Sequence, residues 1–166
     1  MLFRSGPRQS GKTTLVQQFF SKHTYLSLED EQMRSFAQTD PQRFLLSHEN
    51  AHGLILDEFQ HVPSLLSYLQ LEIDAKKRPG YFILTGSQNF LMNAAITQSL
   101  AGRVSIVNLL PLSLLELDTH KLLQSTVDLA LFNGFYPRIY DQALQATKFY
   151  AAYLQSDRKS TRLNSS

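Results

Sequence analysis

The stretch GPRQSGKT, residues 6–13, decides the fold of this chain. It has the pattern G-x-x-x-x-G-K-T of a phosphate-binding loop, in which glycines let backbone N–H groups approach phosphate oxygens closely. Such a loop follows a buried β-strand and opens a helix, whose N-terminus favours an anion. Only the five residues MLFRS precede Gly6, which is short for a buried strand. The strand before the loop therefore needs an explanation, and the two ends of the chain offer one.

Both ends look foreign to the rest of the sequence. Residues 157–166, DRKSTRLNSS, match the in-frame translation of a common short-read sequencing adapter, and residues 1–5 match its reverse strand read from a GTG start. We expect both segments to be non-native, and such segments are set aside in reasoning about the fold. We therefore expect the native part of the chain to be about 6–156. It would be a fragment of a longer protein, cut at both ends, from which the first strand is missing.

Composition narrows the function classes. The chain has 16 basic and 14 acidic residues, and 12 basic and 13 acidic residues remain without the two suspect ends. Charge therefore gives no support to nucleic-acid binding. There is no cysteine, which excludes disulfides and thiolate chemistry, and no apolar run approaches the ~20 residues of a membrane span. A phosphate loop without cysteine is typical of a cytoplasmic protein.

Apolar runs alternate with helical patterns, which predicts an α/β fold with a parallel sheet. We expect strands at 1–5, 24–30, 53–59, 81–87 and 103–110. Helices are expected at 12–22, 40–50, 62–77 and 89–100, and after Pro111 at 112–117, 126–132 and 141–154. In the first helix, the spacing of Leu15, Phe19 and Phe20 predicts the face that packs on the core.

The loop assigns roles to its own residues. Lys12 is expected to reach the β- and γ-phosphates of a nucleotide, and the Thr13 hydroxyl to ligate Mg²⁺. The nucleotide-binding set is Gly6, Pro7, Arg8, Gln9, Ser10, Gly11, Lys12, Thr13 and Thr14.

A second motif, LILDEFQ, supplies two carboxylates at the end of a continuous apolar strand. Ligands of open parallel sheets bind at the carboxyl ends of the strands. There Asp57 is expected to hold Mg²⁺ through its water shell, and Glu58 to orient and deprotonate the attacking water. A GTPase would have Asp-x-x-Gly here and Asn-Lys-x-Asp elsewhere. This chain has Gln60 and lacks the second motif, so ATP is favoured.

Two further stretches hold candidate catalytic residues. FILTGSQN ends a strand in Thr85, Ser87, Gln88 and Asn89, any of which could hold the attacking water or sense the γ-phosphate; a simple turn is the alternative. In LAGRV, Arg103 precedes the fifth strand. It could stabilise transition-state charge on a neighbouring subunit's nucleotide, or be a surface arginine or a helix C-cap partner.

Taken together, four segments resemble a known family: GPRQSGKTTL, LDEFQHVPSLLSYLQ, FILTGSQNFLM and SLAGRVSIVNLLPLSLLEL. In this order and spacing they are similar to the predicted bacterial and archaeal ATPases of the AAA+ class, which carry an AAA domain followed by a C-terminal domain of unknown function. The resemblance runs from residue 6 to about 154. It implies a three-layer P-loop NTPase sandwich with a five-stranded parallel sheet of the additional-strand type.

The resemblance also implies domains and roles. Residues 6–118 would be the ATPase core, and 119–156 the start of a helical lid that is truncated. Lys12 and Thr13 would form the Walker A motif, and Asp57 and Glu58 the Walker B motif. Ser87 or a close neighbour would be the sensor, and Arg103 stands in the position of an arginine finger.

We therefore predict a domain that binds ATP and Mg²⁺, hydrolyses ATP, and couples this to an unknown partner, to the missing C-terminal domain or to copies of itself in a homo-oligomer. One alternative is a nucleotide-gated interaction module with negligible turnover. Another is a small-molecule kinase, which would need several lid arginines, where the native part of the chain after Arg103 has only Arg138. As it stands, the chain is expected to be marginally stable and a poor ATPase, because Arg4 would lie in a central strand.

Overall fold

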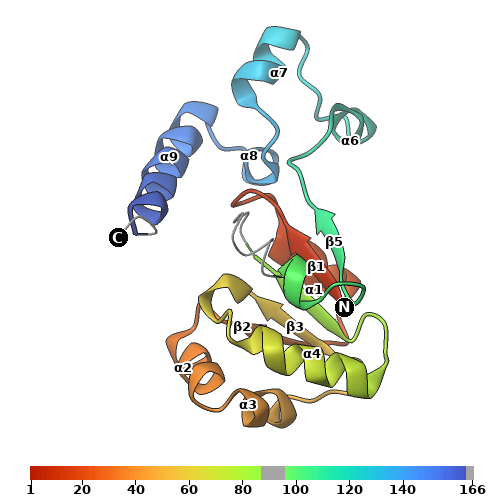
Figure 1. Ribbon diagram of the computed structural model, residues 1–166. Helices are drawn as coiled ribbons and strands as arrows, with labels where there is room; N and C mark the ends of the chain where they lie inside the picture. The colour runs from red at the N-terminus through yellow and green to blue at the C-terminus, as the bar shows by residue number, and fades with distance from the viewer. Residues whose placement is uncertain (87–95, 164–166) are drawn as a thin grey trace. The chain divides into compact units, whose positions relative to one another are not determined.

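The computed structural model of the chain describes residues 1–86 and 96–163. They form two compact units, Met1–Leu109 and Leu110–Ser166. The elements of the first unit are β1 (Leu2–Ser5), α1 (Lys12–Phe19), β2 (Thr24–Ser27), α2 (Glu31–Thr39), α3 (Pro41–Ser47), β3 (Leu54–Asp57), the 3-10 turn η1 (Phe59–His61), α4 (Leu65–Lys76), β4 (Phe82–Thr85) and β5 (Ser105–Asn108) (Figure 1).

The five strands form one parallel sheet in the order β2-β3-β4-β1-β5. β4 is an additional strand between β1, which leads into the phosphate loop, and β3, which ends at Asp57. The predicted α/β fold with a five-stranded parallel sheet is therefore confirmed. Because the strands are parallel, Ser5, Asp57 and Thr85 all lie at the carboxyl edge of the sheet.

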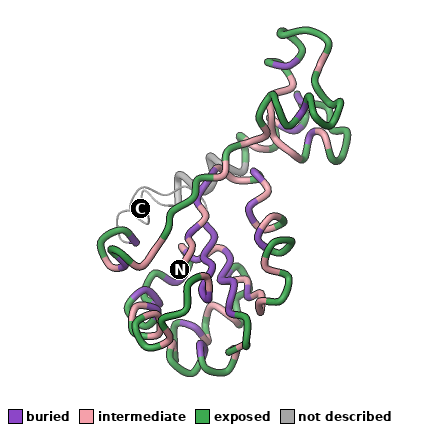
Figure 2. The backbone as a smooth tube through the Cα atoms, turned by 90° about the vertical axis from the view of Figure 1, so that its right-hand side faces the viewer, coloured by how far each residue is buried: buried purple, intermediate pink, exposed green. Residues whose placement is uncertain are grey.

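Helices cover both faces of the sheet. On one face α1 places Val16 against Ile55 and Ile83. On the other face, Phe3, Leu54, Leu56, Phe82 and Leu84 join the larger core, to which α2, α3 and α4 contribute Ala37, Phe44, Leu45, Leu65, Leu66 and Leu69. Figure 2 shows these buried strands at the centre of the first unit. The result is the predicted three-layer arrangement, with β3 and β4 buried at every residue.

Two helices stand between β2 and β3, and the sequence pattern predicted only the second. α2 begins after Asp30, whose carboxylate accepts a hydrogen bond from the Met33 N–H at 2.9 Å. α3 begins after Asp40, which accepts one from the Arg43 N–H at 3.0 Å. An N-cap of this kind typically contributes ~1 kcal/mol. α2 packs Met33, Phe36 and Ala37 on the core, and of these only Ala37 is fully buried; this stripe of three residues was overlooked in the sequence.

One expectation for the first unit was wrong in detail. Phe19 was expected to pack on the core, but it is 74% exposed, and Val16, one turn earlier, is the fully buried residue of α1. The expected start of this helix at Lys12 is observed, but the helix is turned so that Val16 faces the sheet. β5 is an exposed edge strand, with Ile106 and Val107 more than a third accessible. Most of the helix expected at 89–100 lies outside the described residues.

The second unit consists of α6 (Leu114–Thr119), α7 (Val127–Asn133), α8 (Pro137–Asp141) and α9 (Ala146–Leu163). A capping box starts α6, in which Ser113 and Glu116 bond each other's backbone N–H groups. The core of this unit is small: Leu117, Ala130, Ile139, Ala146 and Phe149. α8 was not predicted, because the sequence pattern around NGFYP indicates a break.

The boundary between the two compact units lies between β5 and α6. The sequence placed the end of the ATPase core at 118, which falls inside α6. In the structure the first unit ends at Leu109, directly after β5. The N–H of Leu112 bonds the carbonyl of Phe135 at 2.8 Å, and Leu117 is buried within the second unit. Both observations lie within the second unit, and the expected limits of the ATPase core, 6–118, stay a prediction.

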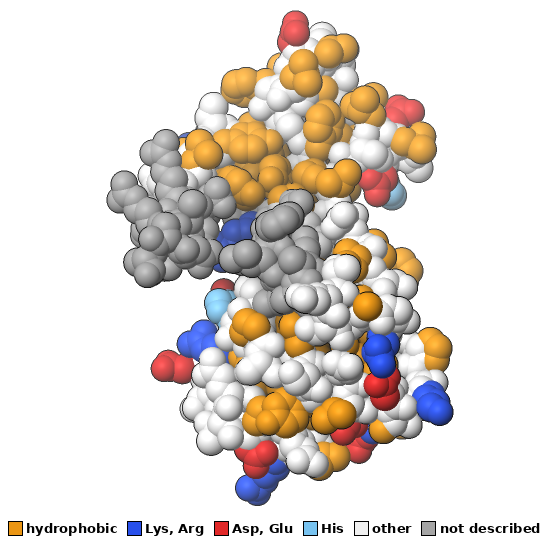
Figure 3. All heavy atoms as spheres, in the orientation of Figure 1, with side chains coloured by type: hydrophobic (Ala, Val, Ile, Leu, Met, Phe, Trp, Pro, Cys, Tyr) orange, Lys and Arg blue, Asp and Glu red, His pale blue; other side chains and the backbone are white. Residues whose placement is uncertain are grey.

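Large apolar side chains remain accessible on the second unit, where Figure 3 shows hydrophobic side chains spread over the visible surface. Leu114, Leu115, Val127, Leu131 and Phe132 are each 58–75% exposed. Among the described helices, none combines the length and apolar character needed to cross a bilayer.

Candidate active site

The phosphate loop connects β1 to α1 at the carboxyl edge of the sheet. Its first glycine, Gly6, has φ 155°, and a Cβ there would lie 2.2 Å from the carbonyl oxygen of Leu109. Gly11 has φ 85° and is the N-cap of α1. Both positions require glycine, for close approach in the first case and for the left-handed backbone in the second. The glycine spacing of the motif thus follows from the local backbone.

The side chain of Lys12 folds back onto the start of the phosphate loop. Its residue is 6% exposed, and its Nζ donates hydrogen bonds to the carbonyl oxygens of Gly6 at 3.0 Å and Pro7 at 2.7 Å. Burial lowers the pKa of the Lys12 ammonium, and this outweighs the opposing effect of Glu58 and Asp57. An ammonium held by neutral carbonyls would gain stronger bonds from phosphate oxygens. Lys12 therefore fits its predicted role.

Asp57 is the centre of the polar cluster at the strand ends. It is 4% exposed, and its Oδ2 accepts hydrogen bonds from the Thr13 hydroxyl at 2.8 Å and the Tyr25 hydroxyl at 2.7 Å. Its Oδ1 accepts one from the Thr85 hydroxyl. The structure thus brings together Thr13 and Asp57, the two residues expected to hold Mg²⁺, although 44 positions separate them in the sequence.

These residues fit a magnesium ion bound together with a nucleotide. Mg²⁺ prefers oxygen ligands, keeps several waters, and is usually held by one or two carboxylates plus substrate phosphates. The adjoining Thr13 hydroxyl and Asp57 carboxylate supply such oxygens. Among residues 1–86 and 96–163 there is no group of three or more His, Cys, Asp or Glu side chains able to hold a metal. A nucleotide would thus have to supply further ligands.

Glu58 follows Asp57 in a left-handed conformation, with φ 54°. This turn ends β3 and begins η1. One Glu58 carboxylate oxygen accepts a hydrogen bond from the Gln60 side-chain amide. The other end of that amide, Gln60 Oε1, is buried without a hydrogen-bond partner in the described structure. It faces Gly86, where a Cβ would lie 2.6 Å away. Gln60 therefore lies between the expected base and the turn after β4.

The other loop residues differ in exposure. Ser10 is 3% exposed, and its hydroxyl has no partner among the described atoms. Gln9 is exposed and has φ 60°. Pro7 and Arg8 are half-buried, and Thr14 is exposed.

The two remaining catalytic candidates stand differently. Ser87 lies outside the described residues, while Thr85, from the same segment, contacts Asp57. Arg103 precedes β5, at the amino edge of the sheet, whereas the phosphate loop lies at the carboxyl edge. Its guanidinium makes two bonds to Asp74 of α4, at 2.6 and 3.0 Å. Within one chain, the structure does not bring Arg103 to the phosphate loop.

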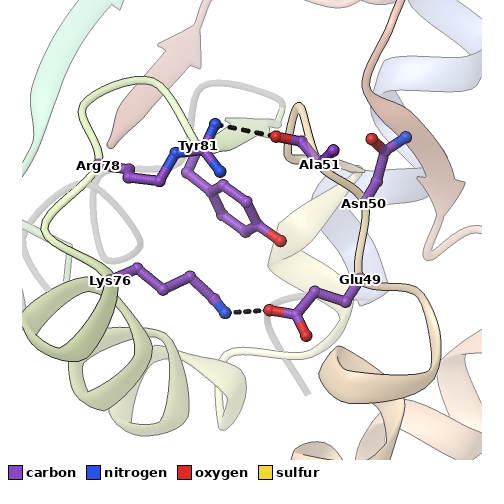
Figure 4. A pocket seen from close by; sticks show the side chains of 6 residues that line it. All are labelled: Glu49, Asn50, Ala51, Lys76, Arg78 and Tyr81. Carbon is purple, nitrogen blue, oxygen red and sulfur yellow. Dashed lines mark hydrogen bonds and ion pairs between the residues drawn. The ribbon is translucent and has the colours of Figure 1, made fainter.

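A pocket of about 400 Å³ opens at the amino edge, between the segments that precede β3 and β4. Figure 4 shows its lining residues, Glu49, Asn50, Ala51, Lys76, Arg78 and Tyr81. Lys76 pairs with Glu49, and Arg78 donates to the Ala51 carbonyl at 2.9 Å. The Lys76 Nζ lies 5.2 Å from the centre of the Tyr81 ring, and the Arg78 Cζ lies 5.3 Å from it. Lys76 and Arg78 thus already bond residues of the facing segment, and these contacts join the two segments across the pocket.

Tyr25, which contacts Asp57, and Gln60, which contacts Glu58, were not predicted as site residues from the sequence. Tyr25 was assigned only to the second strand, and Gln60 was used only to argue against a GTPase. Tyr25 pairs with Ile55 in the sheet, and Ser27 with Asp57. Side chains two residues apart share a face, so the register of two parallel strands is the signal that would have found Tyr25.

The residues of the sheet and of the candidate site also match known proteins. A family model described as an AAA domain matches residues 1–117. Uncharacterized proteins of Mycobacterium bovis and Mycobacterium tuberculosis are each 33% identical over 107 residues, which is 63% of this chain and 24% of each relative. The chain thus spans about a quarter of the length of the curated relatives it matches. The family match covers the sheet, the phosphate loop and the Asp57–Glu58 pair, and the chain belongs to the AAA domain family.

Proposed function

We propose that this AAA domain binds ATP with Mg²⁺ and hydrolyses it. The observation that carries the proposal is the hydrogen bond of 2.8 Å between Thr13 of the phosphate loop and Asp57 at the end of β3. It joins the two motifs at one edge of the sheet, with Lys12 buried in the loop and Glu58 next in the chain.

Each residue has a distinct task in this proposal. The loop amides and Lys12 bind the phosphates, and Thr13 and Asp57 hold the metal site. Mg²⁺, when bound, would neutralise charge on the phosphates and orient them. Glu58 orients a water and accepts its proton as the water oxygen attacks the terminal phosphorus; the bond from that phosphorus to the bridging oxygen breaks, and ADP and phosphate are the products. Once the Gln60 amide releases it, the Glu58 carboxylate is free to do so.

The sensor and finger roles are proposed from the sequence. Ser87 or a neighbour would contact the terminal phosphate or the water. Arg103, at the opposite edge from its own loop, would act on the nucleotide of a neighbouring copy in a homo-oligomer, after leaving Asp74. A turnover rate per subunit that does not depend on protein concentration would contradict action between copies. Coupling to a partner or further domain, in the cytoplasm, belongs to the same proposal.

The test separates binding from chemistry. Glu58→Gln should keep the ATP affinity and lose turnover, because Glu58 acts on the water and not on bound phosphates. Glu31→Gln, on an exposed carboxylate of α2, is the matched control. Affinity is measured by calorimetry with Mg-ATP, and turnover by phosphate release. Equal turnover in the wild type and Glu58→Gln would remove Glu58 from the role of base.

A second function deserves the same experiment. The hydrogen bond from Gln60 to Glu58 favours a nucleotide-gated switch, in which the carboxylate is held away from water and turnover is negligible. A wild-type chain that binds Mg-ATP tightly but releases no phosphate, at any protein concentration, would favour the switch over the hydrolase.

A further inference from the structure

The Asp57 carboxylate is held by more protein donors than the two nucleotide motifs supply. Thr13 belongs to the phosphate loop and Thr85 to the end of β4, but Tyr25 comes from β2. A carboxylate offers about four lone-pair sites, two on each oxygen. Thr13 and Tyr25 occupy both sites of Oδ2, and Thr85 occupies one site of Oδ1. One acceptor site on Oδ1 is therefore left for a metal-bound water.

The position of Tyr25 in the sheet explains why a tyrosine is needed there. Ser27 is the residue beside Asp57, and Tyr25 lies two residues earlier on the same strand. Two residues along a parallel strand span about 6.6 Å, so a short hydroxyl side chain at position 25 would not reach the carboxylate. Tyrosine combines the required length with a donor at its tip.

The ring of Tyr25 is held in place by the core. It packs against Val16 of α1, Ile55 of β3 and Ile83 of β4. Burial, with the hydrogen bond to Asp57 next in size, raises the pKa of the Tyr25 hydroxyl well above its ordinary value. Packing against this cluster therefore fixes the direction in which the hydroxyl donates its hydrogen bond to Asp57.

We propose that Tyr25 is a positioning residue for the metal site, which orients the Asp57 carboxylate so that its remaining Oδ1 lone pair is directed at the metal's water shell. This inference rests on the proposed function, since it assumes that Asp57 serves Mg²⁺ bound with ATP. Thr13 cannot do this task alone, because its oxygen is itself expected to ligate the metal. Tyr25 does not touch the nucleotide in this proposal and acts only through Asp57.

The test removes the hydroxyl and keeps the ring. Tyr25→Phe should raise the Mg²⁺ concentration needed for half-maximal ATP binding by about tenfold, a typical loss for one hydrogen bond to a charged group. ATP binding in the presence of EDTA should not change. Tyr68→Phe, on an accessible tyrosine of α4, is the matched control. Binding is followed by calorimetry, so the result does not depend on turnover.

The possible outcomes separate the two proposals. If the wild-type chain shows no Mg²⁺-dependent ATP binding, the proposed function itself fails. If the wild type shows it and Tyr25→Phe has the same Mg²⁺ midpoint, the positioning role of Tyr25 is overturned. An equal loss of ATP binding with and without the metal, accompanied by a lower melting temperature, would also overturn it, because that pattern indicates a purely structural role.

Discussion

Arg4 is the most testable source of instability in the sheet. It lies in β1 between β4 and β5, where it pairs with Thr85 on one side and Val107 on the other. Its Nε is buried and has no hydrogen-bond partner among the atoms that the structure describes, and burial lowers the pKa of its guanidinium. Arg4→Leu should therefore stabilise the chain.

The size of the effect follows from the unpaired donor. A buried donor without a partner costs about 1–3 kcal/mol, and Leu at this position removes the donor and keeps apolar contact beside Leu2. For a chain of 150–250 residues, each kcal/mol corresponds to roughly 2–4 °C in melting temperature. Arg4→Leu should thus raise the melting temperature by about 2–12 °C.

The assay is a thermal melt followed by circular dichroism, without nucleotide, because only Ser5 separates Arg4 from the phosphate loop. Arg43→Leu, the same replacement on the exposed side of α3, should change the melting temperature little. Replacing residues 1–5 with a longer Val/Ile/Leu-rich strand should stabilise the chain further. If Arg4→Leu melts at or below the wild-type temperature while Arg43→Leu is neutral, the unpaired guanidinium is not what limits stability.

Three further predictions concern the phosphate loop, the metal site and the second unit. Lys12→Ala should weaken Mg-ATP binding roughly tenfold to a hundredfold, the loss of a charge-assisted phosphate contact of about 1.5–3 kcal/mol; unchanged affinity by calorimetry would remove Lys12 from the site. Asp57→Asn should abolish the dependence of ATP binding on Mg²⁺, checked by titrating the metal at fixed ATP. Hydrogen bonds from the Ser113 backbone and hydroxyl lower the pKa of Glu116 from 4.5, so its stabilising effect is complete above pH 4.5 and is lost as the pH falls through the lower folded-state pKa. The difference in melting temperature between the wild type and Glu116→Ala should accordingly shrink in acid, and a constant difference would contradict this.

Features that depend on one contiguous stretch of residues could be predicted from the sequence. The phosphate loop and the Asp57–Glu58 pair could be predicted because each is a contiguous motif with a fixed backbone task. The sheet could be predicted because buried parallel strands contain continuous apolar runs, such as Leu54, Ile55 and Leu56 of β3.

Contacts that depend on the register of two strands, or on partners far apart in the sequence, could not be predicted. Tyr25 meets Asp57 only through the alignment of β2 with β3, and Arg103 meets Asp74 only because α4 ends beside the start of β5. The exposure of Phe19 depends on how α1 is turned toward the sheet; neighbouring helix residues point about 100° apart, and the spacing of Leu15, Phe19 and Phe20 did not reveal that Val16 would face the core.

The contact between Gly6 and Leu109 has a mechanical consequence. The Leu109 N–H bonds the Ser5 carbonyl at 2.8 Å, and the Leu109 carbonyl lies where a side chain at position 6 would begin. The start of the phosphate loop and the last residue of the first unit are therefore fastened together by their main chains. Any side chain at position 6, even the methyl group of alanine, would therefore have to displace the backbone at Leu109. Because Leu109 continues the pairing of β1 with β5, Gly6→Ala would disturb the edge of the sheet as well as the phosphate loop.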